Sequence, residues 1–305
     1  GAVLLSIRFI PIYGFVKGLW FGIFHSISAF CNAGFDITGN SIVPFVGDVV
    51  INLTIAFLII IGGLGFSVYI DITKNKKFKR LSLHSKLAIM ITIVLIVAGM
   101  ILVYAIECNN PETFKYLSGK EKIVASFFQS VVPRTAGFNS IDISKIKDTT
   151  AFVMIILMFI GGSPGSTAGG IKTTTFGAIV LATLTVIKGN KDVEAYKKTI
   201  PHEIIYRSLA IATVGLLLVI VVSMLLTITE DATFLDLLFE TTSAFGTVGL
   251  TRGVTPNLST FGRIIITLTM YFGRVGPLTM AFAFGKNQKT SGANYRYSEE
   301  NIMVG

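Results

Sequence analysis

The stretch Phe127–Asn139 reads FFQSVVPRTAGFN. Long apolar runs lie on both sides of it, Leu87–Ile106 before and Thr149–Ile171 after. Each run has the roughly 20 residues that a helix needs to cross a bilayer. The apolar part of the stretch between them, Ile123–Val132, is too short to cross. We therefore expect it to enter the membrane as a short helix and return to the same side, which gives the order span, re-entrant segment, span.

Two other segments repeat this stretch. Phe24–Asp36 reads FHSISAFCNAGFD and Phe239–Thr251 reads FETTSAFGTVGLT, and each places a glycine before a large apolar residue, as Phe127–Asn139 does. A span with a second group of glycines follows each copy, and these groups are IGGLG at Ile61–Gly65, IGGSPG at Ile160–Gly165 and FGRVG at Phe272–Gly276. Three copies in the same order predict an internal repeat.

The composition is that of a membrane protein. Hydrophobic residues make up 52% of the chain and charged residues 14%, with a mean hydropathy of +0.72, whereas soluble domains carry about 25% charged residues. Val49–Ile70 and Ser208–Thr229 are further uncharged runs of spanning length. The predicted fold class is an all-α polytopic membrane protein, with repeated span–re-entrant pore helix–span units arranged around one pore.

The net charge of +9 is concentrated in two short loops between spans. The basic residues of these loops are Lys74, Lys76, Lys77, Lys79, Arg80 and Lys86, and then Lys188, Lys191, Lys197, Lys198 and Arg207. Basic loops between spans face the cytoplasm, so both loops are predicted to be cytoplasmic, as is the polar tail from Lys286. The segments Cys31–Asp48, Cys108–Asp148 and Glu230–Arg263 should lie outside. Nucleic-acid binding is not expected from loops this short.

The repeated glycine segments suggest a pore lining. Non-helical backbone at membrane depth is tolerated only inside protein or against water. Glycine permits backbone angles that turn successive carbonyls toward one axis, and rings of carbonyls can replace the hydration shell of K⁺. Short helices that point their C-terminal ends at the axis would add a negative dipole end. The alternative interpretation is a set of kinked turns beside helix-packing glycines.

The segments CNAGFD, PRTAGFNSID and SAFGTVGLTRG, with MFIGGSPGSTAGGIKTTTF, closely resemble the Trk/Ktr/HKT superfamily of potassium transporters, and most closely the membrane subunit of bacterial Ktr systems. That family has four pore units, whereas three are present here. The resemblance therefore implies another unit upstream of residue 1. It divides the chain into pore units at 1–80, 81–190 and 191–285, and a cytoplasmic tail at 286–305.

The resemblance also implies the ion-binding residues. The filter positions, whose backbone carbonyls would bind K⁺, are Asn32, Ala33, Gly34 and Phe35, then Thr135, Ala136, Gly137 and Phe138, then Thr247, Val248, Gly249 and Leu250. The implied gate on the cytoplasmic side of the filter consists of Gly161, Gly162, Ser163, Pro164, Gly165, Ser166, Thr167, Ala168, Gly169, Gly170 and Lys172, together with Arg274.

The residues themselves support an interrupted span at this gate. The glycines and Pro164 cannot hold a stable helix between Ile160 and Thr173. Arg274 is the one charged residue in the apolar run Ile264–Gly285, which is predicted to cross the membrane. An arginine buried inside a membrane span is usually paired or functional. Neither span offers an acid, so we expect loop carbonyls or the hydroxyls of Ser163, Ser166 and Thr167 to bind it. A rigid break with a structural arginine is the alternative.

The segment Gly165–Thr173 reads GSTAGGIKT and resembles a phosphate-binding loop. It has one extra residue, an isoleucine, before the lysine of that pattern, and it follows an apolar span instead of a strand. Nucleotide binding is therefore not expected here.

No nucleophile–base pair or metal cluster is evident, so we do not expect an enzyme. The predicted function is K⁺ conduction in an uptake system. The sequence leaves open whether K⁺ uptake depends on symport with Na⁺. An alternating-access cation transporter is the alternative, although its repeats would be inverted. The resemblance implies a homodimer in a bacterial cell membrane, together with a cytoplasmic ring of nucleotide-binding regulatory subunits. No cofactor is expected on this chain.

Polar residues near the filter are predicted to be structural. His25 and Glu240 occupy equivalent positions before their glycines, where a polar group can brace the pore helix. Asp36 and Asp142 follow the filter glycines and could raise the local concentration of cations at the outer mouth, or be plain solvated loop acids. Cys31 and Cys108 do not have the spacing of metal ligands.

Overall fold

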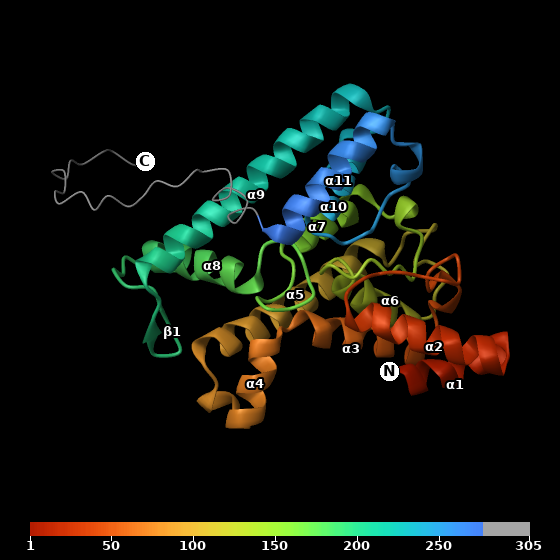
Figure 1. Ribbon diagram of the computed structural model, residues 1–305, viewed down its shortest axis with the longest axis horizontal. Coiled ribbons are helices and arrows are strands. Elements are labelled where there is room, and N and C mark those ends of the chain that lie inside the picture. Colours follow the sequence, from red (N-terminus) through yellow and green to blue (C-terminus); the bar gives the residue numbers. More distant parts are fainter. Residues whose placement is uncertain (277–305) are drawn as a thin grey trace.

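The computed structural model describes residues 1–276, and these form a helical molecule with one small hairpin (Figure 1). The longer helices are α1 (Ala2–Tyr13), α2 (Phe15–Phe30), α3 (Val49–Gly63), α4 (Phe66–Asn75), α5 (Leu83–Glu107), α6 (Gly119–Val131), α7 (Asp148–Phe159), α8 (Thr173–Ile187), α9 (His202–Thr229), α10 (Phe234–Phe245) and α11 (Thr260–Val275). The two-residue strands β1 (Glu194–Ala195) and β2 (Lys198–Thr199) pair antiparallel. The tail at 286–305, for which a cytoplasmic position was predicted, lies outside the described residues.

Within residues 1–276, two helices are long and apolar enough to cross a membrane by themselves. These are α5 and α9, and they contain the predicted runs Leu87–Ile106 and Ser208–Thr229. Side-chain caps fix several helix starts: Ser82 accepts from the Ser85 amide at 3.2 Å at the start of α5, and Ser259 accepts from the Gly262 amide at 3.0 Å at the start of α11. Such caps satisfy amides that have no partner within the helix.

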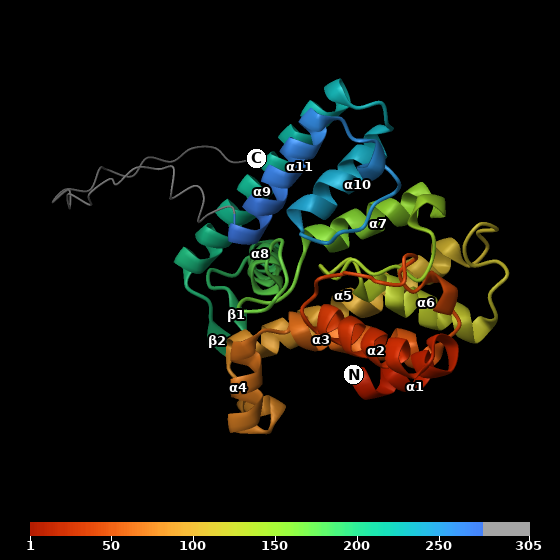
Figure 2. The same cartoon turned by 45° about the vertical axis from the view of Figure 1, so that its right-hand side comes forward.

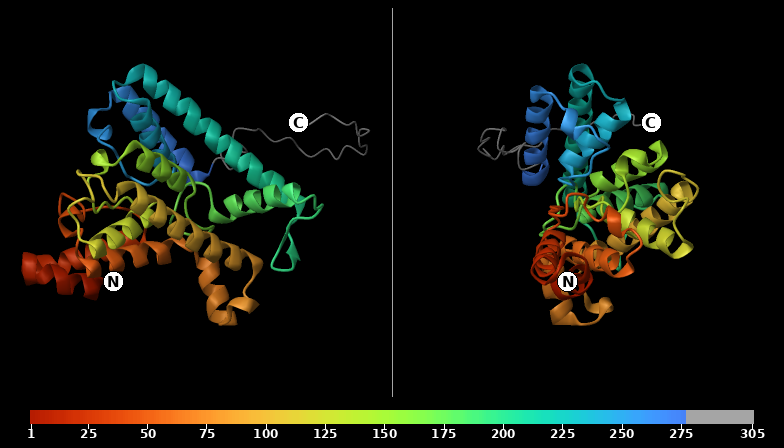
Figure 3. Two further views of the ribbon diagram at one scale, coloured as in Figure 1. Left: turned by 180° about the vertical axis from the view of Figure 1, so that it is seen from behind. Right: turned by 90° about the vertical axis from the view of Figure 1, so that its right-hand side faces the viewer.

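The helices form two groups. In Figures 1 and 2, α9, α10 and α11 lie together on one side, while α1, α2 and α3 lie on the other, with α5 and α7 between them. The side view in Figure 3 shows the same division. The main apolar core lies among α1–α3 and α5–α7, and it includes Phe9, Ile55, Phe128 and Met154, which are all fully or almost fully buried.

The run Val49–Ile70 is not one straight span, as the sequence suggested. It is divided into α3 and α4, which meet at 90°. The bend falls at Gly65, whose φ is +87°. A Cβ at this position would lie 2.4 Å from the carbonyl oxygen of Pro164. The bend therefore depends on close packing against a loop that is distant in the sequence.

Two carboxylates, the buried Glu107 and the partly exposed Glu230, bridge helices that a short helix separates in the chain. Glu107, at the end of α5, accepts from the Lys147 amide at 2.9 Å, just before α7. Glu230, just after α9, accepts from the Ser259 amide at 2.8 Å, just before α11. In both places an acid at the end of one helix satisfies a free amide at the start of the second helix after it, α7 or α11, where the helix dipole favours negative charge.

Candidate ion-conducting site

The three repeated segments have the same unusual backbone. Their first residues have positive φ angles of 50° at Asn32, 71° at Thr135 and 52° at Thr247. Their glycines have φ of 70° at Gly34, 73° at Gly137 and 88° at Gly249. Positive φ is uncommon for non-glycine residues, and for the β-branched threonines it is a marked outlier. Strained backbone of this kind tends to occur at functional sites and persists only where the surrounding structure holds it.

The glycines bring the three segments together. A Cβ placed on Gly34 would lie 2.5 Å from the Ala136 carbonyl oxygen and 2.9 Å from the Gly137 Cα. A Cβ on Gly137 would lie 2.4 Å from the Val248 carbonyl oxygen, and one on Gly249 would lie 3.9 Å from the Gly137 Cα. The segments therefore meet in the order of the chain, with the backbone of each against that of the next.

A short helix leads into each segment. α2, α6 and α10 end two to four residues before the first positive-φ residue of their segments. After the glycines the chain is buried at Phe138 and Leu250, whereas Phe35 is exposed. The twelve residues predicted as filter positions thus lie in three equivalent places, each at the C-terminal end of a short helix.

Arg134 is a residue whose importance the sequence reasoning missed. It immediately precedes the segment at Thr135 and is 6% exposed. Its guanidinium donates to the Thr92 hydroxyl at 3.2 Å and to the Gly161 carbonyl oxygen at 3.4 Å. It therefore bonds both α5 and the first residue of the glycine-rich loop. The available signal was a lone arginine in a segment predicted to enter the membrane, the same signal that singled out Arg274.

The span after the second segment is interrupted. α7 ends at Phe159, and a loop follows before α8 begins at Thr173. Ile160 and Ile171 form an isolated parallel bridge, with the Gly161 amide donating to the Ile171 carbonyl oxygen at 2.9 Å. A Cβ on Gly161 would lie 1.9 Å from the Gly169 carbonyl oxygen, so the two limbs of the loop are in contact.

This loop contacts the bend between α3 and α4 on one side and the third segment on the other. The Ser163 amide donates to the Gly63 carbonyl oxygen at 2.9 Å, and the Phe66 amide donates to that of Gly165 at 3.1 Å. On the other side, a Cβ on Gly169 would lie 2.2 Å from the Thr247 hydroxyl oxygen. The loop therefore lies directly against the first residue of the third segment.

Arg274 binds the loop through a backbone carbonyl. Its Nη1 donates to the Thr167 carbonyl oxygen at 2.5 Å. The predicted hydroxyl partners do not bind it: the Ser166 hydroxyl donates to the Ser163 carbonyl oxygen and the Thr167 hydroxyl to that of Gly62. The expectation of a buried arginine was wrong for the described residues, because Arg274 stands in the last turn of α11 and is exposed. Lys172 donates to the Ala168 carbonyl oxygen at 2.7 Å.

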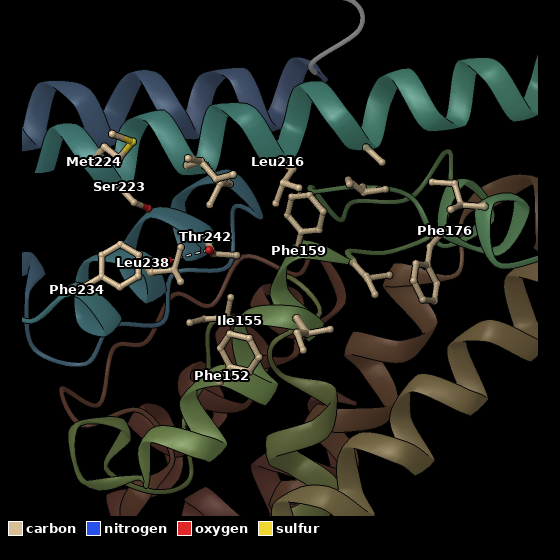
Figure 4. Close-up of a pocket in the computed structure, with 17 residues that line it drawn as sticks. Phe152, Ile155, Phe159, Phe176, Leu216, Ser223, Met224, Phe234, Leu238 and Thr242 are labelled. Carbon is tan, nitrogen blue, oxygen red and sulfur yellow. Dashed lines mark hydrogen bonds between the residues drawn. The ribbon is translucent and has the colours of Figure 1, made fainter. Parts of the chain in front are cut away.

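A cavity of about 550 Å³ lies beside this loop, between α7, α8, α9 and α10 (Figure 4). Its lining includes Ile160 and Ile171 and is apolar apart from the hydroxyls of Ser223 and Thr242. An ion that entered it would lose its hydration shell without gaining ligands in return. The cavity is therefore not an ion site, and the candidate pathway is at the three glycine segments. Both cysteines are free thiols.

Comparisons with known proteins agree on a family. Residues 1–295 match the TrkH model, described as a cation transport protein. The chain is 44% identical to Ktr system potassium uptake protein B of Bacillus subtilis and 42% identical to potassium/sodium uptake protein NtpJ of Enterococcus hirae. Each match covers 100% of this chain and 68% of the relative.

The fold is also that of a solved structure. The crystal structure of the potassium transporter TrkH from Vibrio parahaemolyticus matches with a TM-score of 0.73 at 18% identity. The match covers 92% of this chain and 62% of that one, so the chain spans less than two thirds of the structure that it resembles. At this identity the likeness shows the fold alone. With the family model matching almost the whole sequence, the chain belongs to the TrkH family of cation transport proteins.

Proposed function

We propose that this chain is the ion-translocating membrane subunit of a potassium uptake system and conducts K⁺ between its three glycine segments. The observation that carries the proposal is the shared backbone: positive φ recurs at the first and third residues of all three segments, which meet at their glycines. Left-handed residues that alternate with ordinary ones can turn successive carbonyls toward a common side. The potassium uptake named for the B. subtilis relative supports K⁺ as the ion.

In this proposal the ion binds the backbone carbonyls of the twelve filter positions. Carbonyl oxygens would replace the water that K⁺ sheds. The C-terminal ends of α2, α6 and α10 precede the segments, and their partial negative charge favours a cation there. The three stretches 1–80, 81–190 and 191–285 would each supply one filter segment. The name of the E. hirae relative includes sodium, which supports a test of Na⁺ together with K⁺.

We propose that the loop Gly161–Lys172 is the gate on the cytoplasmic side of the filter. It lies against Thr247 of the third segment and is hydrogen-bonded to the unit that carries the first. Its bond to Arg274 would hold it in the closed position.

Further proposals concern assembly and location. They are a homodimer in a bacterial cell membrane, with the basic loops cytoplasmic, and a cytoplasmic ring of nucleotide-binding regulatory subunits. The word "system" in the relative's name supports additional components.

The experiment is an ion-flux assay with the full-length protein in liposomes. Saturable K⁺ flux, driven by the gradient alone and exceeding that of Na⁺, is the expected result. Flux that requires counter-movement of another ion in fixed proportion would favour the alternating-access cation transporter. Protein that is folded and inserted but moves neither ion would refute the proposal.

A further inference from the structure

Each short helix carries one polar side chain that reaches the chain just beyond its own filter segment. The contacts are His25 Nε2 to Asp36 Oδ1 at 2.9 Å, Gln129 Nε2 to Ser140 Oγ at 3.3 Å, and Glu240 Oε2 to Thr251 Oγ1 at 2.7 Å. In all three the partners are 11 residues apart. We call these contacts the filter braces, because each one spans a filter segment from helix to loop.

The helix side of every brace is buried. His25 is 0% exposed, Gln129 1% and Glu240 5%. A buried polar group without a partner costs free energy, so these side chains hold their loop partners firmly. The chemistry nevertheless differs among the units: the acid is on the loop in the first, on the helix in the third and absent from the second. The same helix-to-loop contact is thus made by different residues in each unit. This indicates that the contact, and not one particular residue pair, is what each unit requires.

The third brace organises the turn that follows Leu250. Glu240 accepts from the hydroxyls of both Thr251 and Thr255. The Thr251 oxygen in turn accepts from the amides of Gly253 at 3.0 Å and Thr255 at 3.4 Å. Both carboxylate oxygens therefore have hydroxyl donors, and the chain after the filter folds around this buried group.

The first brace organises the corresponding turn after Phe35. Asp36 accepts from the amides of Thr38, Gly39 and Ser41 at 2.7–2.9 Å, in addition to the His25 contact. Burial alone would raise the pKa of Asp36, but hydrogen bonds from Thr38, His25 and Ser41 outweigh it and lower the pKa to about 2. The carboxylate is therefore ionised at neutral pH. The Ser41 hydroxyl also accepts from the Asn139 amide, which joins this turn to the second unit.

We propose that Glu240 and His25 are positioning residues that set the preference for K⁺ over Na⁺ by fixing both ends of their filter segments. The inference rests on the proposed function of those segments. Thr247 and Asn32 hold strained positive φ angles, and such strain persists only where the surroundings over-determine it. A segment that is released at its outer end would relax, and its carbonyls would then close around a smaller ion.

The test uses matched substitutions in the full-length protein, with K⁺ and Na⁺ flux measured in liposomes. Thr251→Val has nearly the same shape but removes the donor to Glu240, whereas Thr251→Ser keeps it. Leaving a buried carboxyl oxygen without its donor is costly, so we expect Thr251→Val to lower the K⁺:Na⁺ ratio by about tenfold. Thr251→Ser should retain the ratio of the parent. Asp36→Leu should lower the ratio through the first brace in the same way.

Two further variants make the outcomes distinct. Thr227→Val removes an exposed hydroxyl of α9 whose partner is the Met224 carbonyl oxygen of the same helix, and should leave the ratio unchanged. Gly137→Ser tests the filter itself. If it lowers the ratio while Thr251→Val and Asp36→Leu do not, the braces are refuted and the filter stands. If none of the three lowers it, the proposed filter is refuted and the braces with it.

Discussion

Among the glycines of the proposed filter, Gly137 has much less room for a side chain than Gly249. Its φ is +73°, and an added Cβ would lie 2.4 Å from the Val248 carbonyl oxygen. Gly249 has φ of +88° but its nearest neighbour would be at 3.9 Å. Gly137→Ser therefore adds a collision to the backbone strain of about 1–3 kcal/mol, whereas Gly249→Ser adds strain alone. We expect both to reduce the K⁺:Na⁺ flux ratio, and Gly137→Ser to reduce it more.

Gly189 provides the matched control. It has φ of +71° with nothing within 4 Å of an added Cβ, and it lies in the second basic loop. Gly189→Ser should cost similar strain but leave selectivity unchanged. Variants are compared at equal expression and by thermal unfolding. An unchanged flux ratio in both filter variants would show that the glycine segments do not select the ion.

The glycines were predictable from the sequence, but the strained residues before them were not. Repetition and spacing identify Gly34, Gly137 and Gly249. Nothing local predicts positive φ at Thr135 or Thr247, because a β-branched residue resists it. These angles are held by packing between the three segments, which a linear sequence does not display. The bonds from Arg134 to Thr92 and Gly161 escaped prediction for the same reason.

At the scale of elements, glycine and proline content predicted the break between α7 and α8 but not the bend between α3 and α4. The first break is intrinsic, since Gly161 to Gly170 cannot hold a helix. The bend has fewer local signals, and it depends on Gly65 meeting the Pro164 carbonyl oxygen. The long helices α5 and α9 were predictable because length and hydropathy alone define a span.

The interrupted span leads to a prediction about the gate. Deleting Gly165–Gly170 removes the tip of the loop, and Arg274→Ala removes its bond from α11. If the loop blocks the pathway, both changes should raise K⁺ flux in the absence of regulatory subunits, by roughly tenfold if the lost bond is worth about 1.4 kcal/mol. Arg263→Ala, at the other end of α11, is the control and should not change flux.

The charge and the hydrogen bond of Arg274 can be separated. Arg274→Lys keeps the positive charge with a different donor geometry, and Arg274→Gln keeps a donor without the charge. Flux that rises only in Arg274→Gln assigns the block to charge, whereas a rise in both assigns it to the fitted bond. Low flux in the deletion and in Arg274→Ala, with inserted and folded protein, would favour the rigid break instead of a gate.

At the scale of the whole molecule, the loops of each predicted side meet one another. The first basic loop contacts the second: the rings of Phe78 and Tyr196 have centroids 6.3 Å apart, and Lys86 Nζ lies 5.4 Å from the centre of the Tyr196 ring. On the opposite predicted side, the Ile42 amide donates to the Asn139 carbonyl oxygen at 3.2 Å. This arrangement is consistent with one basic face and one opposing face.

The orientation of these faces gives the last prediction. Lys77 and Lys191 lie in the two basic loops, which the charge rule assigns to the cytoplasm, and Lys115 lies in the opposing loop between α5 and α6. All three side chains are exposed, so a cysteine at each site is accessible without disturbing a contact in the core. The background must lack Cys31 and Cys108, because both are free thiols and neither is buried.

A membrane-impermeant thiol reagent on intact cells should label a cysteine at 115 and spare those at 77 and 191. Permeabilised cells should label all three, which is the control for accessibility. The contact between Phe78 and Tyr196 joins the two basic loops, so both loops must lie on the same side of the membrane. Cysteines at 77 and 191 must therefore be labelled, or spared, together. Labelling at 77 on intact cells would reverse the orientation, and different labelling at 77 and 191 would contradict the two-faced arrangement itself.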